Sequence, residues 1–235
     1  MIRIRKSADR GRADREWLNS HFTFSFGPYQ DPEHSGFRAL RVMNEDRIAP
    51  GKGFGPHAHR DMEIITYVME GHLAHRDSMN ERHVLGPNEI QTMSAGNGIV
   101  HSEFNASETE SVHSIQIWID PASEDLPPSY QQIAFAPTEK RGRLRLLAAP
   151  ARSGGDPMTV INQNARLFVT ELGPGETVTY ALEPGRHAWA QILRGTISLN
   201  GQTLQEGDGA AVSDERELTL AGDAAAGELL LFDLS

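Results

Sequence analysis

Cysteine is absent from this chain of 235 residues. The absence excludes disulfide bonds, thiolate metal ligands and a cysteine nucleophile. No apolar run approaches the roughly 18 residues that a membrane-spanning helix needs, so we expect no membrane partner. The first residues, MIRIRKSADRGRADREW, are basic and polar and lack the apolar segment of a secretory signal. We therefore expect a cytoplasmic protein.

An excess of positive charge is also lacking. The formal net charge is −10, which argues against a surface that follows a phosphate backbone. Acidic residues interrupt the basic residues near the N-terminus, and no series of stacking aromatic residues accompanies them. We interpret this segment as a solvated surface and expect no direct binding of nucleic acid. The basic residues are Arg3, Arg5, Lys6, Arg10, Arg12 and Arg15.

Helical patterns are scarce, and alternation of apolar and polar residues dominates. Residues 21–26 (HFTFSF) alternate and then stop at Gly27-Pro28, as a half-buried strand does. Short helices are expected only at 12–19 and 127–133. Many short strands separated by turns indicate an all-β sandwich or barrel. Further strands are predicted at 37–43, 62–69, 72–76, 112–119, 166–171, 177–182, 187–193, 196–199, 216–220 and 228–233. The Asn200-Gly201 pair predicts a type I′ hairpin within 196–204.

Two halves of the chain follow a similar pattern. Gly51 to Met93 and Gly173 to Val212 each contain a glycine turn, a long apolar strand, a second glycine turn and a hairpin. The Pro-rich and charged segment 120–142 lies between them. Such a repeat predicts two copies of one β unit, which we place at 1–135 and 136–235.

Two short motifs in the first half carry the metal-binding chemistry. His57-Ala58-His59 follows a glycine-rich loop that ends at Gly55-Pro56. Alternate side chains of a strand share one face and lie about 7 Å apart, so two imidazoles can bind one ion. If that strand continues, Asp61 and Glu63 lie on the same face.

The second motif, His101-Ser102-Glu103, repeats this spacing after Gly96-Asn97-Gly98. Together the motifs offer three imidazoles and one carboxylate, a set that suits a divalent first-row metal better than magnesium or calcium. An isolated His-x-His pair is more often a surface or core feature than a ligand pair. One His-x-His pair and one His-x-Glu pair, each behind a glycine-rich turn, favour a metal site with open positions.

These motifs resemble those of a known family. GKGFGPHAHRDMEIITYVMEG is similar to the first cupin motif. MSAGNGIVHSEFN is similar to the second, although Gly96 stands where cupins generally have proline. Together with HRDSM they resemble the pirin family, and most closely its bacterial members described as quercetin 2,3-dioxygenases. The likeness runs from DRGRADREW to about residue 119 and continues more loosely through the C-terminal half.

The resemblance implies a bicupin with two antiparallel jelly-roll barrels and few short helices. It implies a metal bound by His57, His59, His101 and Glu103. We expect one divalent ion per chain, with iron(II) as the first choice and manganese, cobalt, nickel, copper or zinc as alternatives. Arg186-His187-Ala188-Trp189 stands where the second barrel would carry its histidine pair, so that barrel should hold no metal. We expect a monomer.

The implied activity is a metal-dependent dioxygenase that opens the central ring of a flavonol such as quercetin with O2 and releases carbon monoxide. Glu103 or Glu63 would accept the proton of the substrate hydroxyl. Glu63 could also orient a ligand histidine through its other ring nitrogen, or it could be a plain surface carboxylate. Two alternatives are a non-enzymatic regulator of transcription or metabolism that responds to metal or redox state, and an oxygenase for another small aromatic metabolite.

Several residues near the two motifs allow two interpretations. Residues 75–78 (HRDS) could line the mouth of a pocket or end a polar hairpin. A phenylalanine stripe at this spacing is more often core than the wall of a cavity that binds aromatic ligands, so we expect core for Phe22, Phe24 and Phe26. The remaining histidines lack a paired spacing and are expected to be structural or exposed. They are His21, His34, His72, His83 and His113.

Overall fold

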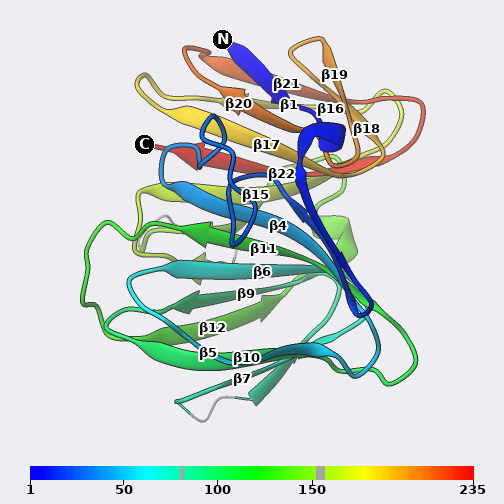
Figure 1. Cartoon of the computed structure of the whole chain (residues 1–235). Coiled ribbons are helices and arrows are strands. Elements are labelled where there is room, and N and C mark those ends of the chain that lie inside the picture. Colours follow the sequence, from blue (N-terminus) through cyan, green and yellow to red (C-terminus); the bar gives the residue numbers. More distant parts are fainter. Residues whose placement is uncertain (80–81, 152–156) are drawn as a thin grey trace. The chain divides into compact units, whose positions relative to one another are not determined.

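The computed structural model describes residues 1–79, 82–151 and 157–235. Nearly all regular secondary structure of the described residues is antiparallel strand, and the chain divides into two compact units (Figure 1). The histidine unit comprises Gly11–Phe135 and Thr159–Gln163, and the C-terminal unit comprises Met1–Arg10, Ala136–Met158 and Asn164–Ser235. The predicted all-β fold is confirmed.

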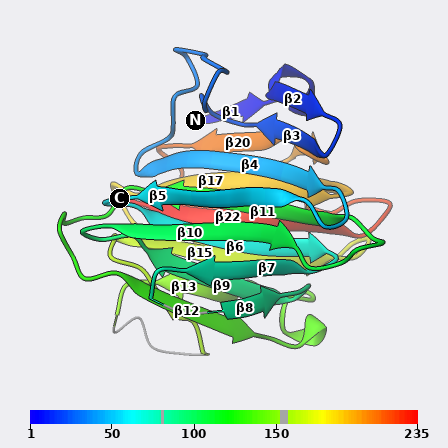
Figure 2. The ribbon, with the colours of Figure 1, turned by 60° about the horizontal axis from the view of Figure 1, so that its bottom comes forward.

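The histidine unit contains two antiparallel sheets. The longer has the strand order β12-β9-β6-β11-β4-β3-β2, and the shorter has the order β5-β10-β7-β8, which is seen in Figure 2. The strands are β2 (Gly11–Arg15), β3 (Leu18–Phe22), β4 (Leu40–Ile48), β5 (Gly53–His59), β6 (Glu63–Glu70), β7 (Leu73–Asp77), β8 (Arg82–Leu85), β9 (Glu89–Ser94), β10 (Ile99–Asn105), β11 (Val112–Ile119) and β12 (Ser129–Ala134). The short strand β14 (Thr159–Val160) also belongs to this unit.

Alternation along the strands determines which side chains face the interior of the histidine unit. On β10, Ile99, His101, Glu103 and Asn105 are buried, whereas the exposed residues lie between them. On the longer sheet, Val68 packs with apolar residues of other strands in one core cluster. Side chains of a strand alternate between its two faces. The same strand register therefore turns both the apolar core residues and the candidate metal ligands toward the interior of the histidine unit.

The C-terminal unit is also built from two antiparallel sheets. Strands β1-β20-β17-β22-β15-β13 follow one another in one sheet and β16-β21-β18-β19 in the other. The strands are β1 (Ile2–Arg5), β13 (Arg145–Ala149), β15 (Ala165–Leu172), β16 (Thr177–Ala181), β17 (His187–Arg194), β18 (Thr196–Leu199), β19 (Gln202–Gln205), β20 (Gly209–Val212), β21 (Glu217–Gly222) and β22 (Gly227–Leu234). Their inner faces form a leucine-rich core.

The predicted hairpin is confirmed. Strands β18 and β19 pair with Leu199 opposite Gln202, so two residues form the turn. Asn200 has φ 46° and Gly201 has φ 80°, the two positive φ angles that a type I′ turn requires.

Both predicted helices are wrong. Residues 12–19 fall on β2 and β3, and 127–133 overlap β12. Pairing with neighbouring strands outweighs the weak helix propensity of these short polar segments. Helical backbone in the described ranges is limited to 3₁₀ turns at Ser7–Asp9 and Pro137–Glu139.

The first ten residues join the C-terminal unit through β1, which pairs with β20. The division of the chain at 135/136 stays a prediction. Within the ranges that the structure covers, no helix combines the length and apolar character needed to cross a membrane.

The turn before β10 depends on glycine at position 96. Gly96 has φ +47°, and a Cβ atom there would lie 2.0 Å from the carbonyl oxygen of Leu126. Proline, with φ fixed near −65°, cannot adopt this conformation, which explains the departure from the usual cupin pattern.

We expect Gly96→Ala to destabilise the protein far more than Gly201→Ala. Gly201 also has a positive φ, of +80°, but a Cβ atom there meets nothing within 4 Å. Gly201→Ala should therefore cost only the backbone term of about 1–2 kcal/mol, and Gly96→Ala about twice that or more. Urea unfolding followed by tryptophan fluorescence measures both losses. Equal losses would show that the contact with Leu126 does not constrain the turn.

Candidate metal centre

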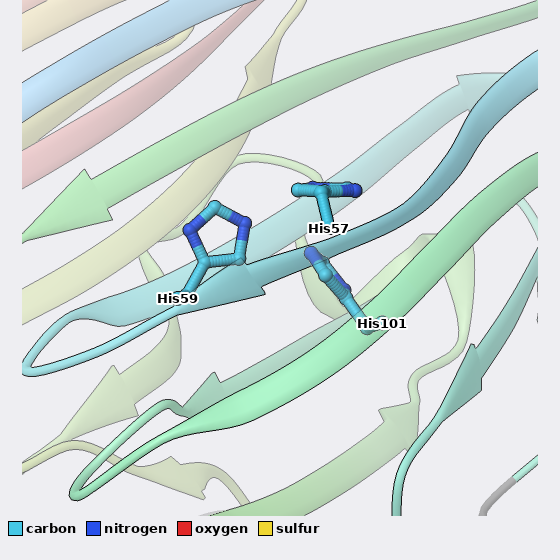
Figure 3. Close-up of side chains that lie close together, drawn as sticks. All are labelled: His57, His59 and His101. Atoms are coloured by element: carbon cyan, nitrogen blue, oxygen red, sulfur yellow. The ribbon is translucent and has the colours of Figure 1, made fainter.

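Strands β5 and β10 bring three imidazoles together. His57 and His59 project from β5 and His101 projects toward them from β10 (Figure 3). The ring centroids are 4.8 Å apart for His57 and His59, 4.4 Å for His57 and His101, and 4.9 Å for His59 and His101. The two spaced motifs predicted these three imidazoles together, and the antiparallel pairing of β5 with β10 brings them into one group.

A bulge in β5 sets the position of His57. His101 pairs with His57, but Glu103 pairs with Phe54, so β5 carries one extra residue opposite this part of β10. The extra length falls at Gly55-Pro56 in the first motif. Strand β5 is the edge strand of its sheet, where a proline is tolerated because no neighbour needs its missing N–H. Bulges of this kind redirect side chains at functional sites.

The free nitrogens of these rings fit a divalent metal. His59 Nε2 and both ring nitrogens of His101 are buried without a hydrogen-bond partner among the described residues. His57 Nδ1 lies 2.8 Å from the carbonyl oxygen of Gly55. If Nδ1–H donates this bond, the lone pair of His57 is on Nε2, where it is available to a metal. Ligand atoms of all three residues lie within 4.8 Å of one another.

Burial keeps the imidazoles of His59 and His101 neutral. It lowers the pKa of His59 to about 4, with a further contribution from His57. It also lowers the pKa of His101 to about 2, with further contributions from the neighbouring histidines His57, His59 and His75. A neutral imidazole is the form that binds a metal, so the rings are ready to bind at neutral pH without losing a proton.

Glu103 lies next to this cluster, in a second group with His75 and His101. The Gln116 amide donates to Glu103 Oε2 at 3.1 Å, and the Thr66 hydroxyl donates to Oε1 at 3.4 Å. Burial raises the pKa of Glu103 to about 7; the Asp46 carboxylate raises it further, and the Thr66 hydrogen bond lowers it.

Glu63 has other contacts. Its Oε1 accepts hydrogen bonds from Ser94 at 2.7 Å and from Asn162 at 3.2 Å, and the side chain is fully buried. On β6, Glu63 is three residues before Thr66, so it lies on the opposite face from the residue that contacts Glu103. Its role as proton acceptor stays a prediction, and these contacts give it no support.

The strand that carries the first histidine pair does not continue. Strand β5 ends at His59, and Asp61 has φ 48° in the turn before β6. The conditional expectation that Asp61 and Glu63 share a face with the histidines is therefore wrong. The backbone N–H of Asp61 instead donates to the carbonyl oxygen of Gly96 at 2.8 Å, which joins the turns that flank the two motifs.

His75 and Asp77 are buried on β7 rather than at an exposed hairpin end. Their side chains are 3.3 Å apart, and the His75 ring centroid lies 5.2 Å from that of His101. Gln91 holds the other ring nitrogen of His75 at 3.3 Å. His75 and Asp77 therefore lie directly beside the histidine cluster. Their position in the sequence did not indicate this.

A cavity of about 180 Å³ adjoins Glu103 inside the histidine unit. Phe22, Phe26, Phe54 and Trp118 supply aromatic walls. The Trp118 ring meets the His59 ring edge-on at a centroid distance of 4.9 Å and meets Phe26 at 5.4 Å. Among the described residues, the three histidines are not part of the cavity wall, and the cavity adjoins their cluster through Glu103 and Trp118.

The phenylalanine stripe divides between two roles. Phe24 is a buried core residue, as expected, whereas Phe22 and Phe26 line the cavity. Strand β3 ends at Phe22, so the three rings do not share one strand face. Trp118 and Gln116 were missed by the sequence reasoning. Their signal in the sequence is the alternation of Ser114, Gln116 and Trp118 with the isoleucines of β11.

In the C-terminal unit, the positions that correspond to the histidine pair have partners of their own. His187 Nδ1 lies 2.7 Å from the Ser213 hydroxyl, and Arg186 forms an ion pair with Asp233. Asp233 also accepts a hydrogen bond from the Tyr180 hydroxyl at 2.6 Å. The absence of a metal from this unit stays a prediction.

We expect the metal-free Glu103→Gln variant to be more stable than the metal-free wild type at pH 8. Because folding raises the pKa of Glu103 from 4.5 to about 7, the folded chain binds this proton more tightly than the unfolded chain. The contribution of Glu103 to wild-type stability therefore falls as the pH rises through this range, by up to about 3 kcal/mol, whereas the histidines contribute equally to wild type and variant.

The advantage of the variant should vanish near pH 4, where the carboxyl group is protonated in both states. Urea unfolding of metal-free protein at the two pH values measures it. Glu124, which is exposed, provides the control, because Glu124→Gln should change stability little at either pH. An advantage for Glu103→Gln that is equal at both pH values would contradict the assignment.

Comparison with known protein families gives two matches. The family model described as Pirin matches residues 3–119, and the model described as quercetinase C-terminal cupin domain matches residues 146–234. The chain is 42% identical to a quercetin 2,3-dioxygenase of Escherichia coli K12 over 234 residues, which cover 100% of this chain and 99% of the relative. It is 40% identical to a pirin-like protein of Caulobacter vibrioides, with 97% and 98% covered.

Solved structures agree. The bacterial pirin YhhW of Escherichia coli in complex with nickel(II) superposes with a TM-score of 0.93 at 41% identity, covering 100% of this chain and 99% of that one. The same protein in a second structure gives a TM-score of 0.94. The bicupin fold expected from the sequence is thus confirmed, and the chain belongs to the pirin family.

Proposed function

We propose that this protein is a metal-dependent dioxygenase that opens the central ring of a flavonol of the quercetin type with O2. The observation that carries the proposal is the cluster of three imidazoles, two of which have buried nitrogens without a partner among the described residues, next to an aromatic-walled cavity that has Glu103 in its wall. The names of the relatives, and the nickel(II) in one of them, support the same reading.

In this proposal His57, His59, His101 and Glu103 hold the metal. The three histidines form one group and Glu103 shares the second group with His101, so the carboxylate lies next to the cluster. The unpartnered nitrogens of His59 and His101 would be costly to bury without a ligand. A divalent metal bound there supplies a Lewis acid that favours the deprotonated form of a substrate hydroxyl.

The residues around the metal position have separate roles. Trp118, Phe26 and Phe22 supply flat apolar walls that suit an aromatic substrate and exclude water. Glu103 accepts the proton of the substrate hydroxyl, because its carboxylate lies in the wall of the cavity beside the metal position. Gln116 and Thr66 hold its two oxygens in place.

We expect His57→Ala, His59→Ala and His101→Ala each to lose most of the bound metal while the strands remain folded. Elemental analysis of the wild type should find about one first-row ion per chain. The core consists of apolar strand residues, so circular dichroism should change little. His72→Ala and His83→Ala remove histidines outside the cluster and should retain the metal. Full metal content in His101→Ala would remove that residue from the site.

Glu103→Gln is expected to reduce flavonol turnover by about a hundredfold or more. The change keeps the size and one oxygen but removes the charge and the proton acceptor. Flavonol loss, oxygen uptake and carbon monoxide release should fall together, with metal occupancy measured in the same sample. Unchanged turnover in metal-replete Glu103→Gln would point to another acceptor, and Glu63→Gln then becomes the variant to assay.

The wild type decides between enzyme and regulator. Metal-loaded protein that consumes no oxygen with any flavonol of a small panel would contradict the dioxygenase proposal. The non-enzymatic regulator, or an oxygenase for another aromatic metabolite, would then take its place.

A further inference from the structure

A stripe of buried polar side chains crosses the inner face of the longer sheet of the histidine unit. Register places Ser20, Asp46 and Ser114 opposite one another on β3, β4 and β11. In the next row, Asn44 lies opposite Gln116. All five line the cavity that adjoins Glu103.

The fold itself does not require this stripe. The row on the far side of Asp46 is apolar, with Leu18, Ile48 and Val112 in one core cluster. Burying polar groups in such a place is costly unless each finds a partner. Some do: the Ser20 hydroxyl donates to Asp46, and Gln116 bonds to both Glu103 and Thr66.

Asn44 is the exception. Its side chain is 3% exposed, and its Oδ1 has no hydrogen-bond partner among the described residues. Asp46 also lines the cavity and lies two residues further along β4, on the same face of the strand as Asn44. Its carboxylate provides a second acceptor next to the Asn44 oxygen. A buried acceptor without a donor weakens the fold, so its retention in a cavity wall indicates a donor that arrives with a ligand.

We propose that Asn44 and Asp46 form a specificity-determining subsite that accepts hydrogen bonds from hydroxyl groups on the edge of a planar aromatic ligand. The inference rests on the proposed function in that it places the ligand in the same cavity. Phe22 and Trp118 offer apolar faces to the rings, whereas the polar stripe meets the rim. Asn44 pairs with Gln116 on the neighbouring strand, and Gln116 bonds to Glu103. The subsite therefore binds ligand hydroxyls other than the hydroxyl whose proton Glu103 accepts.

Acceptors on this wall select for donors. A ligand without hydroxyls at this position would leave the Asn44 oxygen unpaired and would displace any water that solvates it. A site built to bond a hydroxyl discriminates strongly against the analogue that lacks it. Loss of one such bond corresponds to about a tenfold change in affinity.

The test compares two probes, quercetin, with hydroxyls on several positions, and 3-hydroxyflavone, which has only the 3-hydroxyl. Dissociation constants are measured by fluorescence quenching on metal-loaded full-length protein without oxygen, so no turnover occurs. We expect Asn44→Leu to lower the preference for quercetin over 3-hydroxyflavone by about tenfold, mainly through weaker binding of quercetin.

Asn19→Leu is the matched control. Asn19 lies on β3 next to Ser20, so its side chain faces away from the cavity, and this variant should keep the wild-type preference. If Asn44→Leu does not fold, Asn44→Ala removes the same acceptor with less bulk and should lower the preference as well. Circular dichroism and metal content verify each variant.

The subsite proposal would be overturned if folded, metal-loaded Asn44→Leu and Asn44→Ala kept the wild-type preference for quercetin over 3-hydroxyflavone. It would also be overturned if the wild type bound neither probe. Oxygen uptake with quercetin is measured on the same wild-type sample. If the wild type takes up oxygen but the Asn44 variants keep the wild-type ligand preference, the subsite is overturned and the dioxygenase proposal stands. A changed preference without uptake supports the subsite and counts against the dioxygenase.

Discussion

The pairing of β5 with β10 is the constraint on which the candidate metal centre depends. Neither strand carries three imidazoles, and only the register that sets His57 opposite His101 joins the two motifs. A slip by one residue would turn His101 and Glu103 to the outer face together. The hydrogen bond from Asp61 to Gly96 secures this register from the adjoining turns, which places part of the chemistry in backbone contacts outside the cluster.

Burial shifts the pKa values of neighbouring groups in the candidate metal centre in opposite directions. It disfavours the charged form of every group, so the imidazoles of His59 and His101 stay neutral while the Glu103 carboxyl holds its proton up to about neutral pH. Two neutral imidazoles and a carboxyl group whose pKa is raised can thus share one small volume. A cation would compensate the carboxylate charge that burial makes costly.

The sequence predicted best where local chemistry decides the outcome. The Asn200-Gly201 hairpin and the paired histidines follow from turn geometry and from strand alternation, which need no distant partner. The predicted helix at 12–19 failed because cross-strand pairing decides the conformation of a short polar segment. Glu63 and Trp118 could not be assigned, since the face that each side chain occupies depends on where β5 ends and on which strands flank β6 and β11.

The bulge at Gly55-Pro56 has a consequence for association between chains. Strand β5 is an open edge, and a regular edge strand is a template on which another chain can add a strand. Pro56 removes one amide donor and the bulge interrupts the spacing of the rest, so an incoming strand finds no continuous ladder there. The same two residues that direct His57 toward its partners thereby protect the histidine-bearing strand from aggregation.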